Sequence, residues 1–437
     1  MKKTVRIFIG IGFCALLVIA WTIAVTSKST AERQLVLINE ARELMADGIY
    51  SPAVPLLERA AGYDAAHTLT AESELKRAYL ALMNNRGFSR RYTNLLTKQT
   101  NRRDALPDVF IEFANYYLSV SKIQEALEVM RAGIERTGDA DIVALYENSR
   151  YAFETSRAAY QDVTAIYNGT IQVQNDGKWG IANADGTIII ECQYDEISTF
   201  SNGRAIVING TSVYAVDRYN NKIAVTHEKV FAISNFSDDR ISMRFNNGWR
   251  RASGDFELGT NVYEDIGMTS GGYVAAKVDG KWGIIGLDGR WLIEPEFDEI
   301  MQDELGRSYA QGVVFVRNGN HVYLHNGDEF ISDAYDDARP FGDNGYAAVK
   351  KNGKWGYIDA NGVEALPFLY DDALSFGQHL AAVKIGELWG YISLSGNLVI
   401  DAEFFEARSF SGGSAPVRTD RGWQFIILIE YKRGLSL

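Results

Sequence analysis

The sequence predicts a multidomain α+β protein: a membrane segment, a stack of α-helical hairpins, and an all-β domain of about eight repeated units. Three observations predict this order. An uncharged apolar run opens the chain, apolar residues then recur at helical spacing, and short strands separated by turn dipeptides follow. A chain of 437 residues is expected to form two or three domains. We therefore divide it into residues 1–30, 31–157 and 158–437.

The N-terminal segment, residues 1–30, is predicted to anchor the chain in a membrane. Lys2, Lys3 and Arg6 precede an apolar run, and residues 7–25 are long enough to cross a hydrocarbon layer of ~30 Å. Because the cationic flank stays in the cytoplasm, the C-terminal bulk is expected outside it, at the cell membrane. The alternative is a signal peptide whose cleavage releases a secreted protein.

Composition bounds the partners and the chemistry. Residues 166–437 carry 24 Lys and Arg against 37 Asp and Glu, a balance of −13, whereas residues 1–165 are nearly neutral. An acidic half without a basic stripe argues against nucleic acid, whose phosphates require clustered cations. The two cysteines, Cys14 and Cys192, define neither a disulfide framework nor a Cys-ligated metal site.

Residues 31–157 are predicted to form antiparallel helical hairpins, because apolar stripes alternate with short linkers. The stripes run through residues 35–45, 53–61, 75–83, 92–96, 109–118, 123–134 and 142–151.

Two of these hairpins resemble tetratricopeptide repeats. The stretch ARELMADGIYSPAVPLLERA (41–60) carries the Gly-x-Tyr and the Leu-Glu-x-Ala close of that family, and ANYYLSVSKIQEALEVMRAG (114–133) matches less well. Tyr50, Phe88 and Ile123 as equivalent positions give spacings of 38 and 35, near the family period of about 34. The resemblance implies a concave groove for a peptide or partner helix. An ordinary helical domain is the alternative.

Beyond residue 158 the chain is a series of repeated units, which we call tiles. The tiles share three recurring sequence positions, which we call registers. Asn-Gly and Asp-Gly dipeptides, typical of type I′ hairpin turns, separate the short strands. The first register is a Trp position, occupied by Trp179, Ser212, Trp249, Trp282, His321, Trp355, Trp389 and Trp423, at spacings of 33, 37, 33, 39, 34, 34 and 34. The second is an aromatic followed by an acid, as in Tyr194-Asp195, Phe297-Asp298 and Tyr370-Asp371. The third is an aromatic mostly before Gly: Phe200, Phe341, Phe376 and Phe410.

The tile sequence resembles the bacterial WG, or KWG, repeat family. GKWG occurs unaltered at 177–180, 280–283 and 353–356, and the resemblance covers roughly residues 160–437. The units around residues 212, 249 and 321 depart from it. We interpret the repeated residues as structural: Trp179, Trp249, Trp282, Trp355, Trp389, Trp423, Gly180, Gly283, Gly356 and Gly390.

Each tile reads as an antiparallel meander of three or four strands that must pack against its neighbours. One tile, for example, reads as the strands AAVKK (347–351), KWGYIDA (354–360) and VEALPFLY (363–370), followed by the short DDALSF (371–376). Burying one Trp contributes roughly 4–6 kcal/mol before entropy costs, and the following Gly lets another chain segment approach closely. Tyr160-Gln161-Asp162 copies the tail of a tile, so the start of the β half could complete the last tile. That favours a closed β-propeller; an open β-solenoid is the alternative.

Motifs for chemistry are missing from the sequence. It holds no nucleophile motif, phosphate loop or metalloprotease helix, and His321 and His325 lie on a predicted strand. We therefore predict no catalytic residue, no cofactor and no metal. The acidic pairs such as Asp195-Glu196 recur once per tile, and they either gather to bind cations or a basic partner or are solvated strand ends.

The expected function is that of a membrane-anchored extracytoplasmic scaffold that binds a protein or cell-wall partner. Its binding surfaces would be the tetratricopeptide-like hairpins and the WG-repeat domain. The alternative is an envelope enzyme or enzyme subunit that hydrolyses glycans, which requires two carboxylates about 5 to 9.5 Å apart in a cleft. A dry axial channel without buried carboxylates would argue against that enzyme.

Overall fold

The structure, a computed structural model, describes residues 30–432. It divides the chain into two compact units between Tyr146 and Glu147, whereas the sequence placed the boundary at residue 157. The predicted membrane segment, residues 7–25, lies outside the described residues. No helix within residues 30–432 is long and apolar enough to cross a membrane.

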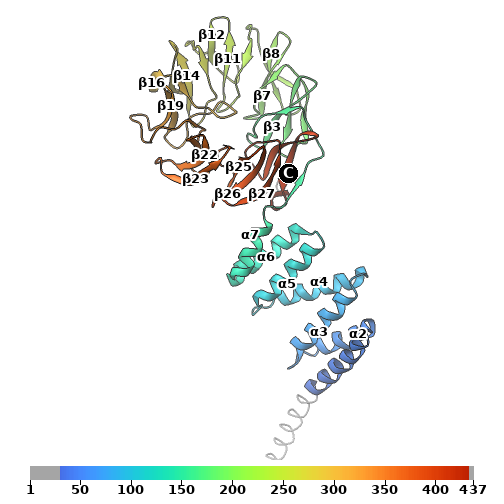
Figure 1. The fold of residues 1–437 in the computed structure, drawn as a ribbon. Coiled ribbons are helices and arrows are strands. Elements are labelled where there is room, and N and C mark those ends of the chain that lie inside the picture. Colours follow the sequence, from blue (N-terminus) through green and yellow to red (C-terminus); the bar gives the residue numbers. More distant parts are fainter. Residues whose placement is uncertain (1–29, 433–437) are drawn as a thin grey trace, which may run out of the picture. The chain divides into compact units, whose positions relative to one another are not determined.

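The first unit is helical, as its periodicity predicts, and consecutive helices follow one another along it (Figure 1). The described residues before Phe153 form seven helices: residues 30–46, α2 (Tyr50–Ala61), α3 (Thr68–Ala81), α4 (Arg86–Thr100), α5 (Pro107–Ser119), α6 (Ile123–Thr137) and α7 (Ala140–Ser149). Pro107 begins α5, where its missing N–H costs nothing, and Gly138 ends α6 in the left-handed conformation. Tyr79, Tyr92 and Phe113 fill the core between the helices.

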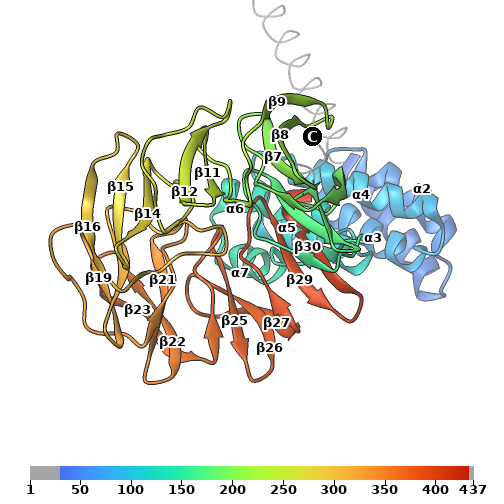
Figure 2. The same ribbon diagram turned by 90° about the horizontal axis from the view of Figure 1, so that it is seen from above.

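The second unit contains eight small sheets arranged in a ring (Figures 1 and 2). We number these blades in chain order. Blade 1 is β2 (Asp162–Val163), β3 (Thr170–Asn175), β4 (Lys178–Asn183) and β5 (Ile188–Tyr194). Blade 2 is β6 (Glu196–Ile197), β7 (Arg204–Asn209), β8 (Ser212–Asp217) and β9 (Lys222–Thr226). Blade 3 is β10 (Ala232–Ile233), β11 (Arg240–Phe245) and β12 (Gly248–Ser253), and blade 4 is β13 (Asp265–Ile266), β14 (Tyr273–Val278), β15 (Lys281–Gly286) and β16 (Trp291–Phe297).

The remaining four blades follow the same order. Blade 5 is β17 (Glu299–Ile300), β18 (Val314–Asn318) and β19 (His321–His325). Blade 6 is β20 (Asp337–Ala338), β21 (Tyr346–Lys351), β22 (Lys354–Asp359) and β23 (Glu364–Tyr370), and blade 7 is β24 (Asp372–Ala373), β25 (Leu380–Ile385), β26 (Leu388–Ser393) and β27 (Leu398–Phe404). Blade 8 is β28 (Glu406–Ala407), β29 (Ser414–Thr419), β30 (Gly422–Leu428) and β1 (Phe153–Thr155).

The ring is closed by pairing the start of the β unit with its end. Strand β1 runs antiparallel to β30, with Phe153 opposite Leu428, and Tyr160 and Trp423 exchange backbone hydrogen bonds of 2.9 Å. The N-terminal tail of a tile thus completes the last blade. The closed eight-bladed propeller is confirmed, and the alternative of an open solenoid is wrong.

One detail of the predicted tile is also wrong. The sequence placed the short strand in DDALSF (371–376) at the end of its own tile, but β24 pairs with β25 of the next blade. The reason is geometric: the last strand of a tile lies at the outer edge of its blade, so the chain must return to the inner edge to begin the next blade. The outer position also explains Pro295 and Pro367, because an edge strand tolerates a missing N–H.

Blade 6 shows what the Trp-Gly pair does in a tile. Trp355 and Tyr357 share one face with Leu366 and pack against blade 7, whereas Ile358 faces blade 5. A β-bulge in β23 brings the outer strand across the Gly between them. A Cβ on the equivalent glycines would lie within 2.3 Å of a carbonyl oxygen at Gly180 and within 3.0 Å at Gly356.

The degenerate units differ in their outer strands. The unit around Ser212 keeps four strands. In blades 3 and 5 the outer strand is reduced to isolated bridges, such as Trp249 with Tyr263 and Val322 with Tyr335.

Candidate functional site

The first acid of the recurring aromatic–acid pair ties neighbouring blades together. Lys178 Nζ lies 2.5 Å from Asp195 Oδ1, and the N–H of Gly210, in the turn of the next blade, donates to Asp195 Oδ2 at 2.6 Å. Hydrogen bonds from the Lys and the turn N–H lower the pKa of the aspartate. The same clamp recurs as Lys281–Asp298–Gly319 and Lys354–Asp371–Gly386. These acids thus have a structural partner, and so does the Lys of Lys-Trp-Gly.

The centre of the ring is occupied by an insertion in blade 5. The linker between the first two strands runs Ser198–Gly203 in blade 2 but Met301–Val313 in blade 5. The extra residues, 302–307, form a compact turn: Oδ1 of Asp303 accepts the N–H groups of Leu305 and Arg307, and its Oδ2 accepts Arg307 Nε at 2.6 Å. We call residues 302–307 the axial loop.

The axial loop contacts blades on several sides of the ring. Leu305 O accepts Asn235 Nδ2 of blade 3 at 3.0 Å, and Gly306 O accepts the N–H of Met268 of blade 4 at 2.8 Å. Glu304 Oε2 lies 3.2 Å from Arg408 Nε of blade 8. The loop therefore divides the centre into two cavities, and Gln302, Asp303 and Glu304 line both of them.

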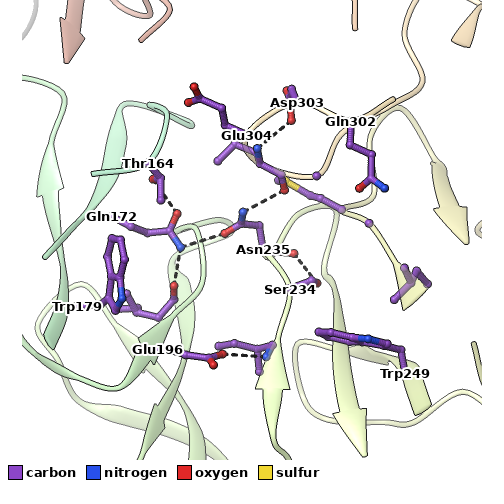
Figure 3. Close-up of a pocket in the computed structure, with 17 residues that line it drawn as sticks. Thr164, Gln172, Trp179, Glu196, Ser234, Asn235, Trp249, Gln302, Asp303 and Glu304 are labelled. Atoms are coloured by element: carbon purple, nitrogen blue, oxygen red, sulfur yellow. Dashed lines mark hydrogen bonds between the residues drawn. The ribbon is translucent and has the colours of Figure 1, made fainter. Parts of the chain in front are cut away.

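The first cavity, of about 470 Å³, lies beside blades 1 to 4 (Figure 3). A chain of amides crosses its wall: Gln172 Nε2 donates to Asn235 Oδ1 at 3.0 Å, and Thr164 Oγ1 donates to Gln172 Oε1 at 2.9 Å. Glu196 and the axial-loop acids add carboxylates. None of the described residues that line this cavity is Lys, Arg or His. The cavity therefore combines amide and carboxylate groups with apolar and aromatic side chains.

Two of the repeated tryptophans line this cavity. Trp179 and Trp249 stand on different sides of it (Figure 3) and are half-buried. The other four repeat tryptophans are sealed between blades, with exposed fractions of 8% or less: Trp282, Trp355, Trp389 and Trp423. Arg339 and Arg408 each stack 4.5 Å above the ring of such a sealed Trp. The same repeat position therefore serves as core in four blades and as cavity wall in two.

Two carboxyl groups of the first cavity, those of Glu196 and Glu304, have raised pKa values. Burial raises the pKa of Glu196, although its Oε2 accepts the N–H of Ile233 at 3.1 Å. Burial also raises the pKa of Glu304, against the opposing effect of Arg408. Carboxyl groups with raised pKa values in a cavity are typical of sites that bind ligands or transfer protons.

The second cavity, of about 430 Å³, lies beside blades 6 to 8 and the start of blade 1. Its wall carries the aromatics of the third register, Phe341, Phe376 and Phe410. The glycine after the aromatic lets neighbouring linkers touch, since a Cβ on Gly377 would lie 2.2 Å from Phe410 O. Arg307 and Arg339 also line this cavity, but each is paired with a carboxylate.

The histidines of the HVYLH stretch do not converge. His325 is buried, its Nδ1 accepts the N–H of Gly327 at 3.0 Å, and its ring packs on Phe297 and Phe330. His321 is exposed. Within residues 30–432, no group of three or more His, Cys, Asp and Glu side chains is placed to hold a metal ion.

The axial loop is the element of the candidate site that sequence reasoning missed. Its signal was present, because the spacing from Trp282 to His321 is 39 where the neighbouring intact tiles give 34. A long spacing indicates an insertion, but the position within the tile decides whether the extra residues reach the axis or the rim.

The fold and its repeat define a closed eight-bladed β-propeller whose blades share one tile sequence. The sequence model of the family described as WG containing repeat matches residues 158–179, 179–210, 262–282, 282–320, 325–355, 355–389 and 389–423. The chain belongs to the WG-repeat proteins. The unmatched stretch, residues 211–261, holds the degenerate units around Ser212 and Trp249.

Solved structures with a similar arrangement are distant in sequence. The AfRom2 CNH domain is 7% identical, covers 63% of this chain and 96% of its own, and gives a TM-score of 0.32. The Pan2 WD40 domain of Neurospora crassa is 12% identical, with 53% and 85% covered and a TM-score of 0.30. A regucalcin of Agrobacterium tumefaciens is 10% identical, with 53% and 88% covered and a TM-score of 0.24. No curated protein matches the sequence. Similarities this weak carry no argument about function.

Proposed function

We propose that this WG-repeat protein is an extracytoplasmic binding scaffold that holds a cell-envelope glycan in the first cavity of its propeller. The observation that carries the proposal is the exposure of Trp179 and Trp249 to a polar cavity, where the other repeat tryptophans are sealed. Aromatic faces pack against the C–H faces of sugar rings, and carboxylates and amides pair with hydroxyl groups. Both kinds of group line this cavity, as a ligand site requires.

Anchoring and a second binding surface complete this proposal. Residues 7–25 would hold the chain in the membrane with the propeller outside, and the hairpin unit would bind a protein partner. Membrane fractionation and protease protection of intact cells test the orientation: the propeller should be cleaved from outside. A chain that stays in the soluble cytoplasmic fraction would refute the anchoring.

The glycan site is tested by calorimetric titration of the detergent-solubilised full chain with soluble cell-wall glycan fragments. Glu196→Gln should weaken binding about tenfold, because it removes a charged acceptor while an amide oxygen can still accept the N–H of Ile233. Glu299→Gln is the matched control, since Glu299 occupies the same tile position in blade 5 but does not line the cavity. Absence of saturable binding, or equal losses in both variants, would refute the site.

A second candidate function is glycan hydrolysis at the same cavity. The observation that favours it is that Glu196 and Glu304 both line the cavity and both have raised pKa values. A raised pKa suits a general acid, and a second carboxylate completes the usual pair. Release of new reducing ends from cell-wall polysaccharide, abolished by Glu196→Gln at glycan concentrations that still saturate the variant, would establish an enzyme. Binding without any such release would leave the scaffold.

A further inference from the structure

Blade 3 carries an arginine at a tile position where the intact tiles carry a buried core residue. Its strand β12 reads Trp249-Arg250-Arg251, so Arg250 replaces the tile glycine and Arg251 replaces the apolar residue after it. The register confirms the equivalence, because Arg251 pairs with Ser242 as Ile181 pairs with Gln172. In five other blades that position is fully buried: Ile181, Ile284, Tyr357, Tyr391 and Phe425.

The Arg251 guanidinium is incompletely satisfied. One terminal nitrogen donates to Gly286 O of blade 4 at 3.1 Å, but the other is buried without a hydrogen-bond partner. Within residues 30–432, no carboxylate lies within 4.0 Å of it. Burial lowers the pKa of Arg251, and Arg240 nearby lowers it further. Arg251 is half-buried, and a covered guanidinium nitrogen with neither a hydrogen-bond partner nor a counter-charge is destabilising, so the site needs an explanation.

A cavity lies beside this guanidinium. It is present because blade 3 lacks the regular outer strand of an intact tile. The loop that replaces this strand is held by Arg250, which donates to Gly259 O at 2.7 Å. The cavity, of about 380 Å³, is lined by Arg240, Arg251, Ser253, Thr260, Asn261 and Tyr263, among others. Two acids, Glu257 and Asp288, also line it, and neither forms an ion pair with Arg251.

We propose that this cavity binds an oxyanion, the carboxylate or phosphate group of a small ligand, on the Arg251 guanidinium. A guanidinium offers two parallel donors that match both groups. Here the terminal nitrogen without a protein partner is covered, so a turn of the Arg251 side chain into the cavity would bring it to the ligand. Arg240 adds a second positive charge, while hydroxyl and amide groups of the loop can bind the rest of the ligand. The site lies between blades 3 and 4 and is separate from the first cavity, so it does not depend on the glycan proposal.

The test titrates the full chain with inorganic phosphate and, separately, with acetate, at constant ionic strength kept with potassium chloride. Calorimetry and thermal unfolding should give a saturable signal and a rise in Tm for at least one anion. Phosphate alone would indicate a phosphorylated ligand and acetate alone a carboxylate ligand. The titration covers anion concentrations from about 20-fold above that of the protein up to about 50 mM. The absence of a saturable response to either anion over this range would overturn the proposal.

Arg251→Ile is the decisive variant, because it restores the residue found in blades 1 and 4. It should raise the Tm without anion and weaken anion binding at least tenfold. Arg218→Gln, which removes one exposed cation from blade 2, should bind as the wild type does. If Arg251→Ile does not fold, Arg251→Lys decides: it keeps the charge but loses the paired donors, so binding should weaken. Unchanged binding in either Arg251 variant would overturn the assignment.

Discussion

Replacing Trp355 by alanine should destabilise the propeller strongly and leave glycan binding unchanged. Trp355 is only 4% exposed and packs with Tyr357, Leu366 and Tyr370 against the next blade. Truncating a buried aromatic to alanine costs about 3–5 kcal/mol. The Arg339 guanidinium 4.5 Å above the ring adds about 0.5–1 kcal/mol that is also lost. We therefore expect a loss of about 3.5–6 kcal/mol.

Trp179→Ala is the matched comparison, because it occupies the same tile position but lines the first cavity. Its indole is half-buried, so roughly half of the area term is lost, about 2–3 kcal/mol. The same change should weaken binding of soluble glycan fragments, because one wall of the cavity disappears. The two variants separate stability from binding.

Urea unfolding followed by circular dichroism measures the stability of both variants without relying on tryptophan fluorescence. Equal slopes with different midpoints would show that each change lowers the free energy of unfolding without altering the surface exposed on unfolding. If Trp355→Ala unfolds within 1 kcal/mol of the wild type and loses the ligand, the sealed tryptophans are sites rather than core. If both variants lose binding equally, the distinction between sealed and lining tryptophans is wrong.

Three further outcomes follow from the structure. Gly180→Ala should cost about 3 kcal/mol and Gly356→Ala about 1, because a methyl group would lie 2.3 Å and 3.0 Å from outer-strand carbonyls; equal urea midpoints would contradict this. Asp371→Asn should lower the urea midpoint at low salt and much less at 1 M salt, since the clamp is exposed; a salt-independent loss would contradict a charged clamp. Burial raises the pKa of Glu304, so the stability it confers is complete below its ordinary value of 4.5 and is lost as pH rises through the raised pKa. Glu304→Gln should remove that decline from urea midpoints measured between about pH 4 and 8, and an unchanged pH dependence would contradict it.

The tile residues have separate tasks that a sequence repeat cannot distinguish. The Lys of Lys-Trp-Gly joins blades through the aspartate clamp, the Trp fills the space between blades, and the Gly admits the bulged outer strand. All three recur at one period because each blade repeats the same contact with its neighbour. The repeated residues are therefore structural, and both proposed sites lie where a tile departs from the repeat or where its Trp lines a cavity.

Sequence reasoning reached the propeller because the required signals are local. The Asn-Gly and Asp-Gly dipeptides mark the hairpin turns, and Tyr160 marks the tile fragment that closes the ring. It misplaced the short strand at Asp372, because the sheet to which a two-residue strand belongs depends on pairing with the next blade. Pairing between blades leaves no periodic signal within one tile.

By itself, the sequence determined the two architectures, the period of the tiles and their approximate number, because strand alternation, turn dipeptides and repeat spacing are properties of short segments. It favoured a closed ring but left the open solenoid as an alternative, which the pairing of β1 with β30 excluded. Only the tertiary structure decided which residues meet at the centre. It brings the axial loop to Asn235 and Arg408, opens Trp179 to a cavity and leaves Arg251 without a counter-charge. Each of these contacts depends on which blades face one another across the ring, and no pattern within a short segment encodes that arrangement.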